Sequence, residues 1–221
     1  RDRKYIDHTA THRHRGVEDL MRYAHLITCC FSGGIGPDRK FVVAESLPSF
    51  RFSDEVLYAL ALYIYSLEPP PNPNRLEATA ARGQTIFARE GCVNCHTPPL
   101  YTNNKLTLAD GFKPAADHPN HADILAISVR TDPGTALQTR KGTGFYKVPS
   151  LKGAWYRGHY GHDGAVTTLA EWFDPARLKA DFVPSGWKGY RVTHRAVRGH
   201  EFGLRLPQDE RDALIAFLKT L

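Results

Sequence analysis

The chain has 221 residues, of which 42% are hydrophobic and 24% charged, so it can bury one large core or two small ones. Its formal net charge of +6 is scattered and forms no basic run interleaved with aromatics, which argues against nucleic acid as a partner. No apolar run approaches the ~18 residues that a membrane span needs, so no transmembrane segment is expected. The basic charge is interpreted either as a surface without a specific partner or as a surface that docks to an acidic redox partner.

The N-terminal segment, up to Leu67, contains two helical patterns. Apolar residues recur at helical spacing between residues 17 and 28. The second pattern starts at Ser53, a typical N-cap residue, which two acidic residues follow. Residues 68–74, EPPPNPN, then end this helix and predict an extended linker.

The four cysteines form two pairs with different spacing. Cys92 and Cys95 are separated by two residues and followed by His96, which is the attachment pattern of haem c. Each thiol would form a thioether with a haem vinyl group, and the imidazole would bind one face of the iron. A zinc site would need a second ligand pair at suitable spacing, whereas Cys29 and Cys30 are adjacent. We therefore predict one covalent haem c, and leave Cys29 and Cys30 open between buried thiols, a disulfide and contacts with another chain.

The region after the linker predicts an all-α, loop-rich haem domain over residues 76–221. A helical pattern over 75–89 leads directly into the haem motif. Residues 97–166 are rich in proline, glycine and asparagine, so we expect only short helical turns there. A short helix is expected over 168–173, and a final helix with Pro207 as its first helical residue. A helix before the haem motif that packs against a C-terminal helix is the cytochrome c arrangement.

An internal repeat indicates a second cytochrome-like unit. Residues 54–67 and 208–221 align as DEVLYALALYIYSL over QDERDALIAFLKTL. Upstream of each lies a His-x-Gly turn, at 14–16 and at 162–164, followed by a short helical pattern. We infer that residues 1–68 are a partial cytochrome c-like domain without its own haem motif, joined through the linker 69–75 to the haem domain.

Two stretches carry a resemblance to a known family. Residues 146–153, YKVPSLKG, and 160–169, YGHDGAVTTL, are similar to the signature VPSLR…PYxHDGSxxTLE of the bacterial di-haem cytochrome c peroxidase and MauG superfamily. Within it, residues 199–203, GHEFG, and the proline-rich linker look more like the rubber oxygenase branch. The resemblance implies two haem domains per polypeptide, one relaying electrons and the other reacting with peroxide or oxygen.

The chain departs from the peroxidase pattern at two points. In peroxidases a methionine downstream of the His-Asp-Gly turn ligates the electron-transfer haem, and MauG has a tyrosine there. The corresponding position falls near Pro175-Ala176, which offers no ligand, and the single methionine, Met21, lies in the other half. Only one haem motif is present. Complete peroxidase or oxygenase activity by this chain alone is therefore in doubt.

The second axial ligand decides what the haem does, because a histidine, a methionine or an open position gives different chemistry. His200 is our candidate, since it lies in the turn before the closing helix and the rubber oxygenase branch uses a histidine there. His162 is the alternative ligand, and an open position is the third possibility.

Other site residues follow from side-chain type. Arg157 is a candidate partner for a haem propionate, because guanidinium groups bind carboxylates well, with Arg130, Arg140 and Lys141 as alternatives. Trp155 is a candidate for the haem edge, and a place in the core is its alternative. The superfamily can hold calcium between its haems, but no motif in this sequence supports a calcium site.

These features predict an exported c-type cytochrome that transfers single electrons through a bis-histidine haem. Because haem c is attached outside the cytoplasm, we expect a periplasmic or extracellular location. The chain begins at Arg1 without a signal region, so we expect it to be processed or partial. The alternative is the C-terminal portion of a di-haem peroxidase or oxygenase whose reactive haem lies in a missing N-terminal part or a partner chain. A redox partner protein, or a second haem-bearing chain or fragment, is expected in either case.

Overall fold

The structure is a computed structural model that describes part of the chain in full. The fully described residues are 16–25, 52–113, 116, 123–125, 127–134, 136 and 144–221, and the backbone is described at 5–6, 13–14, 26–30, 34–35 and 41–42. The side chains of Cys29, Cys30, Arg140 and Lys141 lie outside the described residues. What was expected of these four residues stays a prediction.

The chain divides into two compact units between Pro69 and Pro70, inside the proline-rich run. The first unit contains α1 (Val17–Cys30) and α2 (Asp54–Ser66), which pack together. Its strands are two residues long and pair as antiparallel β1 (Tyr5–Ile6) with β2 (Arg13–His14) and β3 (Gly34–Ile35) with β4 (Phe41–Val42). The assignment of this unit as a partial cytochrome domain stays a prediction.

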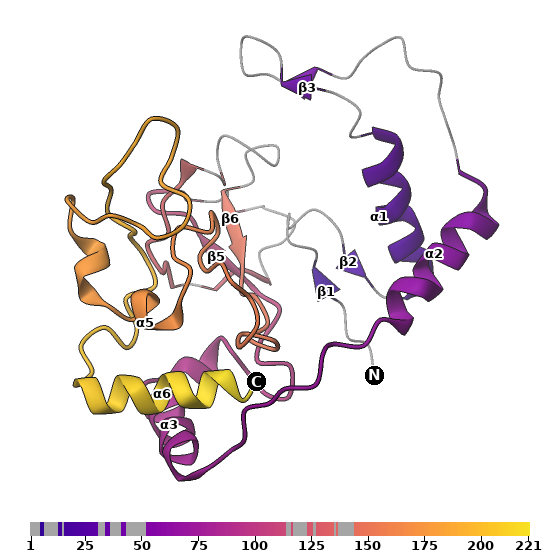
Figure 1. The fold of residues 1–221 in the computed structure, drawn as a ribbon. Coiled ribbons are helices and arrows are strands. Elements are labelled where there is room, and N and C mark those ends of the chain that lie inside the picture. The colour runs from indigo at the N-terminus through magenta and orange to yellow at the C-terminus, as the bar shows by residue number, and fades with distance from the viewer. Residues whose placement is uncertain are drawn as a thin grey trace. The chain divides into compact units, whose positions relative to one another are not determined.

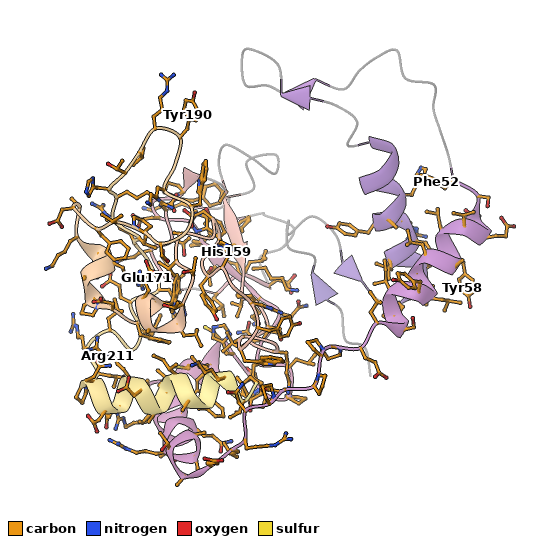
Figure 2. The ribbon with its side chains drawn as sticks, viewed as in Figure 1. Phe52, Tyr58, His159, Glu171, Tyr190 and Arg211 are labelled. Carbon is orange, nitrogen blue, oxygen red and sulfur yellow. The ribbon has the colours of Figure 1, made fainter. Side chains whose placement is uncertain are left out.

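Helix α2 begins where the sequence predicts. Ser53 has an extended backbone, and its hydroxyl accepts a hydrogen bond from the Val56 amide at 3.4 Å, as an N-cap residue does. Only Leu57 and Ala61 of this helix are buried, although most of its residues are apolar. Tyr58 is exposed on it (Figure 2). Most of the apolar side chains of α2 are therefore not buried by contacts within the first unit.

The second unit is organised around two helices, α3 (Ala78–Arg89) and α6 (Gln208–Lys219), which pack against each other (Figure 1). Between them in sequence lie the 3-10 helices η1 (Cys92–Asn94) and η4 (Pro175–Leu178) and the short helix α5 (Leu169–Trp172). The mostly α, loop-rich character that the sequence predicts is confirmed. Helix α3 begins three residues later than predicted, and Pro207 is the N-cap of α6 rather than its first helical residue.

The prediction that residues 97–166 contain only helical turns is wrong. Strands β5 (Leu106–Leu108) and β6 (Phe145–Lys147) form an antiparallel pair. Three residues are too few to display the alternation by which a strand is recognised in sequence. The pair is stabilised instead by long-range contacts, including a hydrogen bond from the Thr107 hydroxyl to the Tyr146 carbonyl at 3.2 Å.

The main core lies between α3 and α6. Ile86 and Phe87 of α3 pack against Leu214 and Phe217 of α6, and the rings of Phe87 and Phe217 meet edge to face at 5.3 Å. Gly83 permits this close approach, because a Cβ atom there would lie 1.9 Å from the carbonyl oxygen of Ala213. Among the described residues, no helix has the length and apolar character required to cross a membrane.

The substitution Gly83→Ala tests this contact. Glycine to alanine usually stabilises a helix interior by ~0.5–1 kcal/mol, but here the new methyl group collides with the α6 backbone. We expect Gly83→Ala to lower the free energy of unfolding by about 1–3 kcal/mol, the usual cost of overpacking. Urea denaturation of the haem-loaded protein measures it, with Gln84→Ala, at an exposed position of the same helix, as the control. Unchanged or increased stability of Gly83→Ala would contradict the close contact.

Candidate haem site

One turn of chain presents the three residues of the haem motif. Gly91 follows α3 in the left-handed region, with φ +74°, and redirects the chain into η1. The His96 amide donates to the Cys92 carbonyl at 2.8 Å, which closes the turn. Cys92 and Cys95 are unpaired and partly exposed, and His96 is buried. Two thiols and an imidazole thus come from one rigid element, as covalent haem attachment requires.

The environment of the two thiols differs from that of a redox-active pair. Burial, with a smaller contribution from Glu90, raises the pKa of Cys92 to about 11, and burial also raises the pKa of Cys95. Cysteines in redox CxxC motifs have a lowered pKa because positive charges or a helix N-terminus stabilise the thiolate. Neither thiol of this motif has that property, so the arrangement favours haem attachment over disulfide exchange.

His96 is held in the orientation of a metal ligand. Its Nδ1 lies 3.1 Å from the carbonyl oxygen of Tyr101, which can only accept, so Nδ1 carries the proton in the neutral ring and the lone pair lies on Nε2. Burial lowers the pKa of His96, which keeps the imidazole neutral. A carbonyl bonded to the second ring nitrogen is the usual support for a ligating histidine.

His200 is the imidazole that the structure places next to His96. The two ring centroids are 6.2 Å apart, and the ring planes form an angle of 61°. Two imidazoles on opposite sides of one metal ion, with bonds of ~2 Å to their nitrogens, have centroids roughly 6 Å apart. Burial lowers the pKa of His200 to about 4, with smaller contributions from His96 and Arg177, so this ring is neutral as well. Its Nδ1 is buried without a hydrogen-bond partner, as in a site built for a group that the protein alone does not supply.

The backbone at His200 is tightly constrained. Gly199 and His200 both lie in the left-handed region, with φ +88° and +50°. A Cβ atom at residue 199 would lie 2.8 Å from the Arg130 carbonyl oxygen, so only glycine fits there. The His200 amide donates to the Val129 carbonyl at 2.7 Å, and its ring lies 5.4 Å from that of Phe202. A backbone hydrogen bond and the close contact at Gly199 therefore constrain the chain around His200.

Arg177 is a site residue that the sequence analysis missed. Its buried guanidinium donates to the carbonyl oxygens of Trp172 at 2.7 Å, Gly199 at 2.9 Å, His200 at 2.8 Å and Val197. It also stacks on the Trp172 ring at 4.6 Å, and that ring lies 5.6 Å from the His200 ring. Burial lowers the pKa of Arg177 to about 10, so it remains charged at neutral pH. No local motif marks this arginine, because its partners lie up to 23 residues away.

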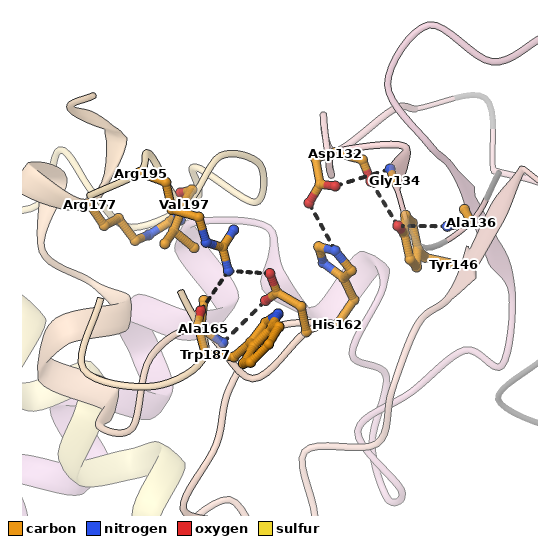
Figure 3. A network of polar contacts seen from close by, with 11 residues as sticks. Asp132, Gly134, Ala136, Tyr146, His162, Ala165, Arg177, Trp187, Arg195 and Val197 are labelled. Atoms are coloured by element: carbon orange, nitrogen blue, oxygen red, sulfur yellow. Dashed lines mark hydrogen bonds and ion pairs between the residues drawn. The ribbon is translucent and has the colours of Figure 1, made fainter. Parts of the chain in front are cut away.

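The alternative ligand, His162, makes contacts of a different kind (Figure 3). Its Nε2 lies 2.9 Å from a carboxylate oxygen of Asp132, and its ring lies 4.8 Å from that of Tyr146. The hydrogen bond with His162 is the main cause of the lowered pKa of Asp132. The structure thus gives His162 a carboxylate partner, whereas it brings His200 to His96.

The neighbouring Asp163 pairs with Arg195, whose guanidinium also donates to the Trp187 carbonyl at 2.8 Å (Figure 3). Ligand atoms of Asp132, His162 and Asp163 lie within 4.8 Å of one another. Calcium prefers six to eight oxygen ligands, and the arginine already neutralises one of the two carboxylates. The group therefore acts as a charge network, and calcium gains no support from it.

Trp155 and Arg157 make other contacts among the described residues. The ring of Trp155 is half-buried against Tyr156, at 5.0 Å between centroids. Arg157 is exposed and donates to the Ser150 carbonyl at 3.1 Å. Arg130 is exposed as well. Their roles at a haem edge or propionate stay predictions.

Comparison with known proteins gives distant relatives. No family model matches the chain. It is 28% identical over 167 residues to cytochrome-c peroxidase IdrP1 of Pseudomonas sp. (strain SCT), covering 67% of this chain and 41% of the relative. It is 29% identical over 118 residues to cytochrome-c peroxidase IdrP1 of Denitromonas iodatirespirans, covering 43% of this chain and 30% of the relative.

The chain spans less than half the length of these curated relatives. Their printed name, cytochrome-c peroxidase, agrees with the thiols and imidazoles described above. The relatives support a cytochrome c peroxidase-like family for this chain, and with it a haem-based redox role and haem c as the cofactor.

Proposed function

We propose that the chain is a c-type cytochrome that transfers single electrons, with haem c attached at Cys92 and Cys95 and held axially by His96 and His200. The observation that carries the proposal is the pair of neutral imidazoles with centroids 6.2 Å apart. When bound, the haem supplies a centre that accepts and releases one electron.

The protein's own residues would keep this centre closed to other ligands. His96 and His200 would hold the iron from its two sides, and burial lowers the pKa of both imidazoles, which favours the neutral forms that bind a metal. The rings of Trp172 and Phe202 both contact the His200 ring, with centroids at 5.6 and 5.4 Å. With both positions filled, peroxide or oxygen would have no site on this iron.

An acidic redox protein is the proposed partner, and the periplasm or extracellular space the proposed location. The net charge of +6 and the exposed loop that carries Tyr190 (Figure 2) support a docking role. The location rests on haem c attachment, which takes place outside the cytoplasm.

A second candidate is supported by helix α2. In the repeat, Tyr63 and Ile64 of α2 align with Phe217 and Leu218 of α6. The two α6 residues pack in the core and are only 2% and 5% exposed to solvent. Tyr63 and Ile64 are 62% and 40% exposed. Within the described residues, α1 packs against α2 but leaves Tyr63 and Ile64 exposed.

This candidate is the C-terminal portion of a di-haem peroxidase or oxygenase, in which α2 would close a first haem domain. Relatives more than twice as long as the matched region favour it. The MauG and rubber oxygenase branch is the finer proposal, supported by residues 199–203 and the linker. In this case the haem at Cys92 would relay electrons to the reactive haem.

The substitution His200→Gly tests the axial pair. Glycine tolerates the left-handed backbone at this position, so the fold should persist while the ligand is lost. We expect the wild-type haem to be six-coordinate and low-spin, and the variant to bind carbon monoxide about tenfold or more tightly, because the position is no longer occupied. Added imidazole should restore the low-spin spectrum. The matched variant His162→Gly should keep the wild-type spectrum, and a spectrum lost in His162→Gly but kept in His200→Gly would contradict the assignment.

The intact mass of the protein isolated from its source separates the two candidates. A species of the 24.8 kDa sequence mass plus one haem favours the single-haem cytochrome. A longer polypeptide with two covalent haems that consumes peroxide at the expense of a reduced donor favours the second candidate. A long polypeptide with one haem would contradict the di-haem reading.

A further inference from the structure

Arg177 is a buried cation that the haem motif and its two imidazoles do not account for. Charged side chains are rarely buried without a carboxylate partner, because leaving water is costly. The described bonds of its guanidinium all go to carbonyl oxygens rather than to a carboxylate. The exposed Glu201 is the acidic group that favours its charged form. Among the described residues, Arg177 therefore does not serve as one half of an ion pair, and its role must follow from the carbonyl groups that it binds.

The acceptors of Arg177 indicate what it holds. Val197, Gly199 and His200 belong to one strap, residues 197–200, which leads to the candidate ligand. One nitrogen, Nη2, binds both the Gly199 and the His200 carbonyl. The fourth acceptor, Trp172, ends helix α5. The planar fork of donors therefore ties the strap to a separate, packed element.

The strap depends on these hydrogen bonds from Arg177, because its backbone is in a disfavoured conformation. His200 is a non-glycine residue in the left-handed region and directly follows another left-handed residue, Gly199. The remaining backbone bond at His200 is the one from its amide to Val129. Without Arg177, three carbonyl groups of the strap would lose their partner, and the ring of His200 would be free to turn away from His96.

We propose that Arg177 is a positioning residue that fixes His200 as the second axial ligand, and that its buried positive charge raises the reduction potential of the haem. This inference rests on the proposed bis-histidine haem. The guanidinium lies 4.6 Å from the Trp172 ring, and that ring lies 5.6 Å from the His200 ring, so the charge is close to the proposed ligand. Reduction adds one electron to the haem, and a nearby cation in a region of low dielectric constant favours the reduced form.

Two substitutions separate the effect of the hydrogen bonds between Arg177 and the strap from the effect of its positive charge. Arg177→Gln removes the charge and most of the donors, and Arg177→Lys keeps the charge but loses the planar fork. We expect both variants to show a partly high-spin oxidised spectrum and to bind carbon monoxide about tenfold or more tightly than wild type, because His200 leaves the iron in a fraction of molecules. Added imidazole should restore the low-spin spectrum in both. With imidazole bound, the reduction potential should be lower in Arg177→Gln than in Arg177→Lys.

Arg211→Gln is the matched control. Arg211 is also a partly buried arginine that donates to a backbone carbonyl, that of Phe173 at 3.1 Å, but it does not bind the strap. This variant should keep the wild-type spectrum, carbon monoxide affinity and potential. If Arg177→Gln does not retain haem, Arg177→Lys alone still tests whether the hydrogen bonds of Arg177 position His200.

The outcomes distinguish this inference from the function on which it rests. A wild-type protein that is high-spin or binds carbon monoxide readily would overturn the bis-histidine haem itself. A low-spin, closed wild type whose Arg177→Lys variant is equally low-spin and closed would overturn the positioning role alone. Equal potentials of the two Arg177 variants in the presence of imidazole would overturn the role of the charge.

Discussion

The contact between α3 and α6 is the constraint on which the candidate site depends. The haem motif follows α3 directly, and the strap with His200 leads into α6, so the packing of these helices brings the two imidazoles together. Gly83 allows the helices to touch at the Ala213 backbone, and the amide of Asn72 ties the linker to the last turn of α6 at 2.8 Å. Two distant stretches of sequence become one site because two helices that flank them share a core.

Two arginines then hold the loops that precede α6. Arg177 binds the carbonyl groups of residues 197, 199 and 200, and Arg195 pairs with Asp163 of the His-Asp-Gly turn. His162, next to Asp163 in sequence, lies against Asp132 (Figure 3). The turn that carries the family resemblance is thus engaged in charge pairs with Arg195 and Asp132, whereas the His200 ring lies next to that of His96.

The sequence predicted the parts of the fold that depend on local patterns. The helix starts at Ser53 and Thr168 are confirmed, because the side chain of each accepts a hydrogen bond from the amide three residues later, as N-caps do. The haem motif fixed the centre of the site because its geometry is contained in one turn. Strands β5 and β6 and the buried Arg177 were missed, because their partners lie far away in sequence and no local pattern encodes them. His200 could be proposed from its turn, but its distance from His96 required the structure.

Electron paramagnetic resonance of the oxidised, haem-loaded protein, prepared with ¹⁵N-labelled histidine, tests the central claim most directly. The account predicts a low-spin iron whose hyperfine spectrum contains two histidine nitrogens bound to the metal, and the loss of one of them in His200→Gly. A single histidine nitrogen in the wild type, with water or another group opposite it, would contradict the claim that His96 and His200 bind the same iron.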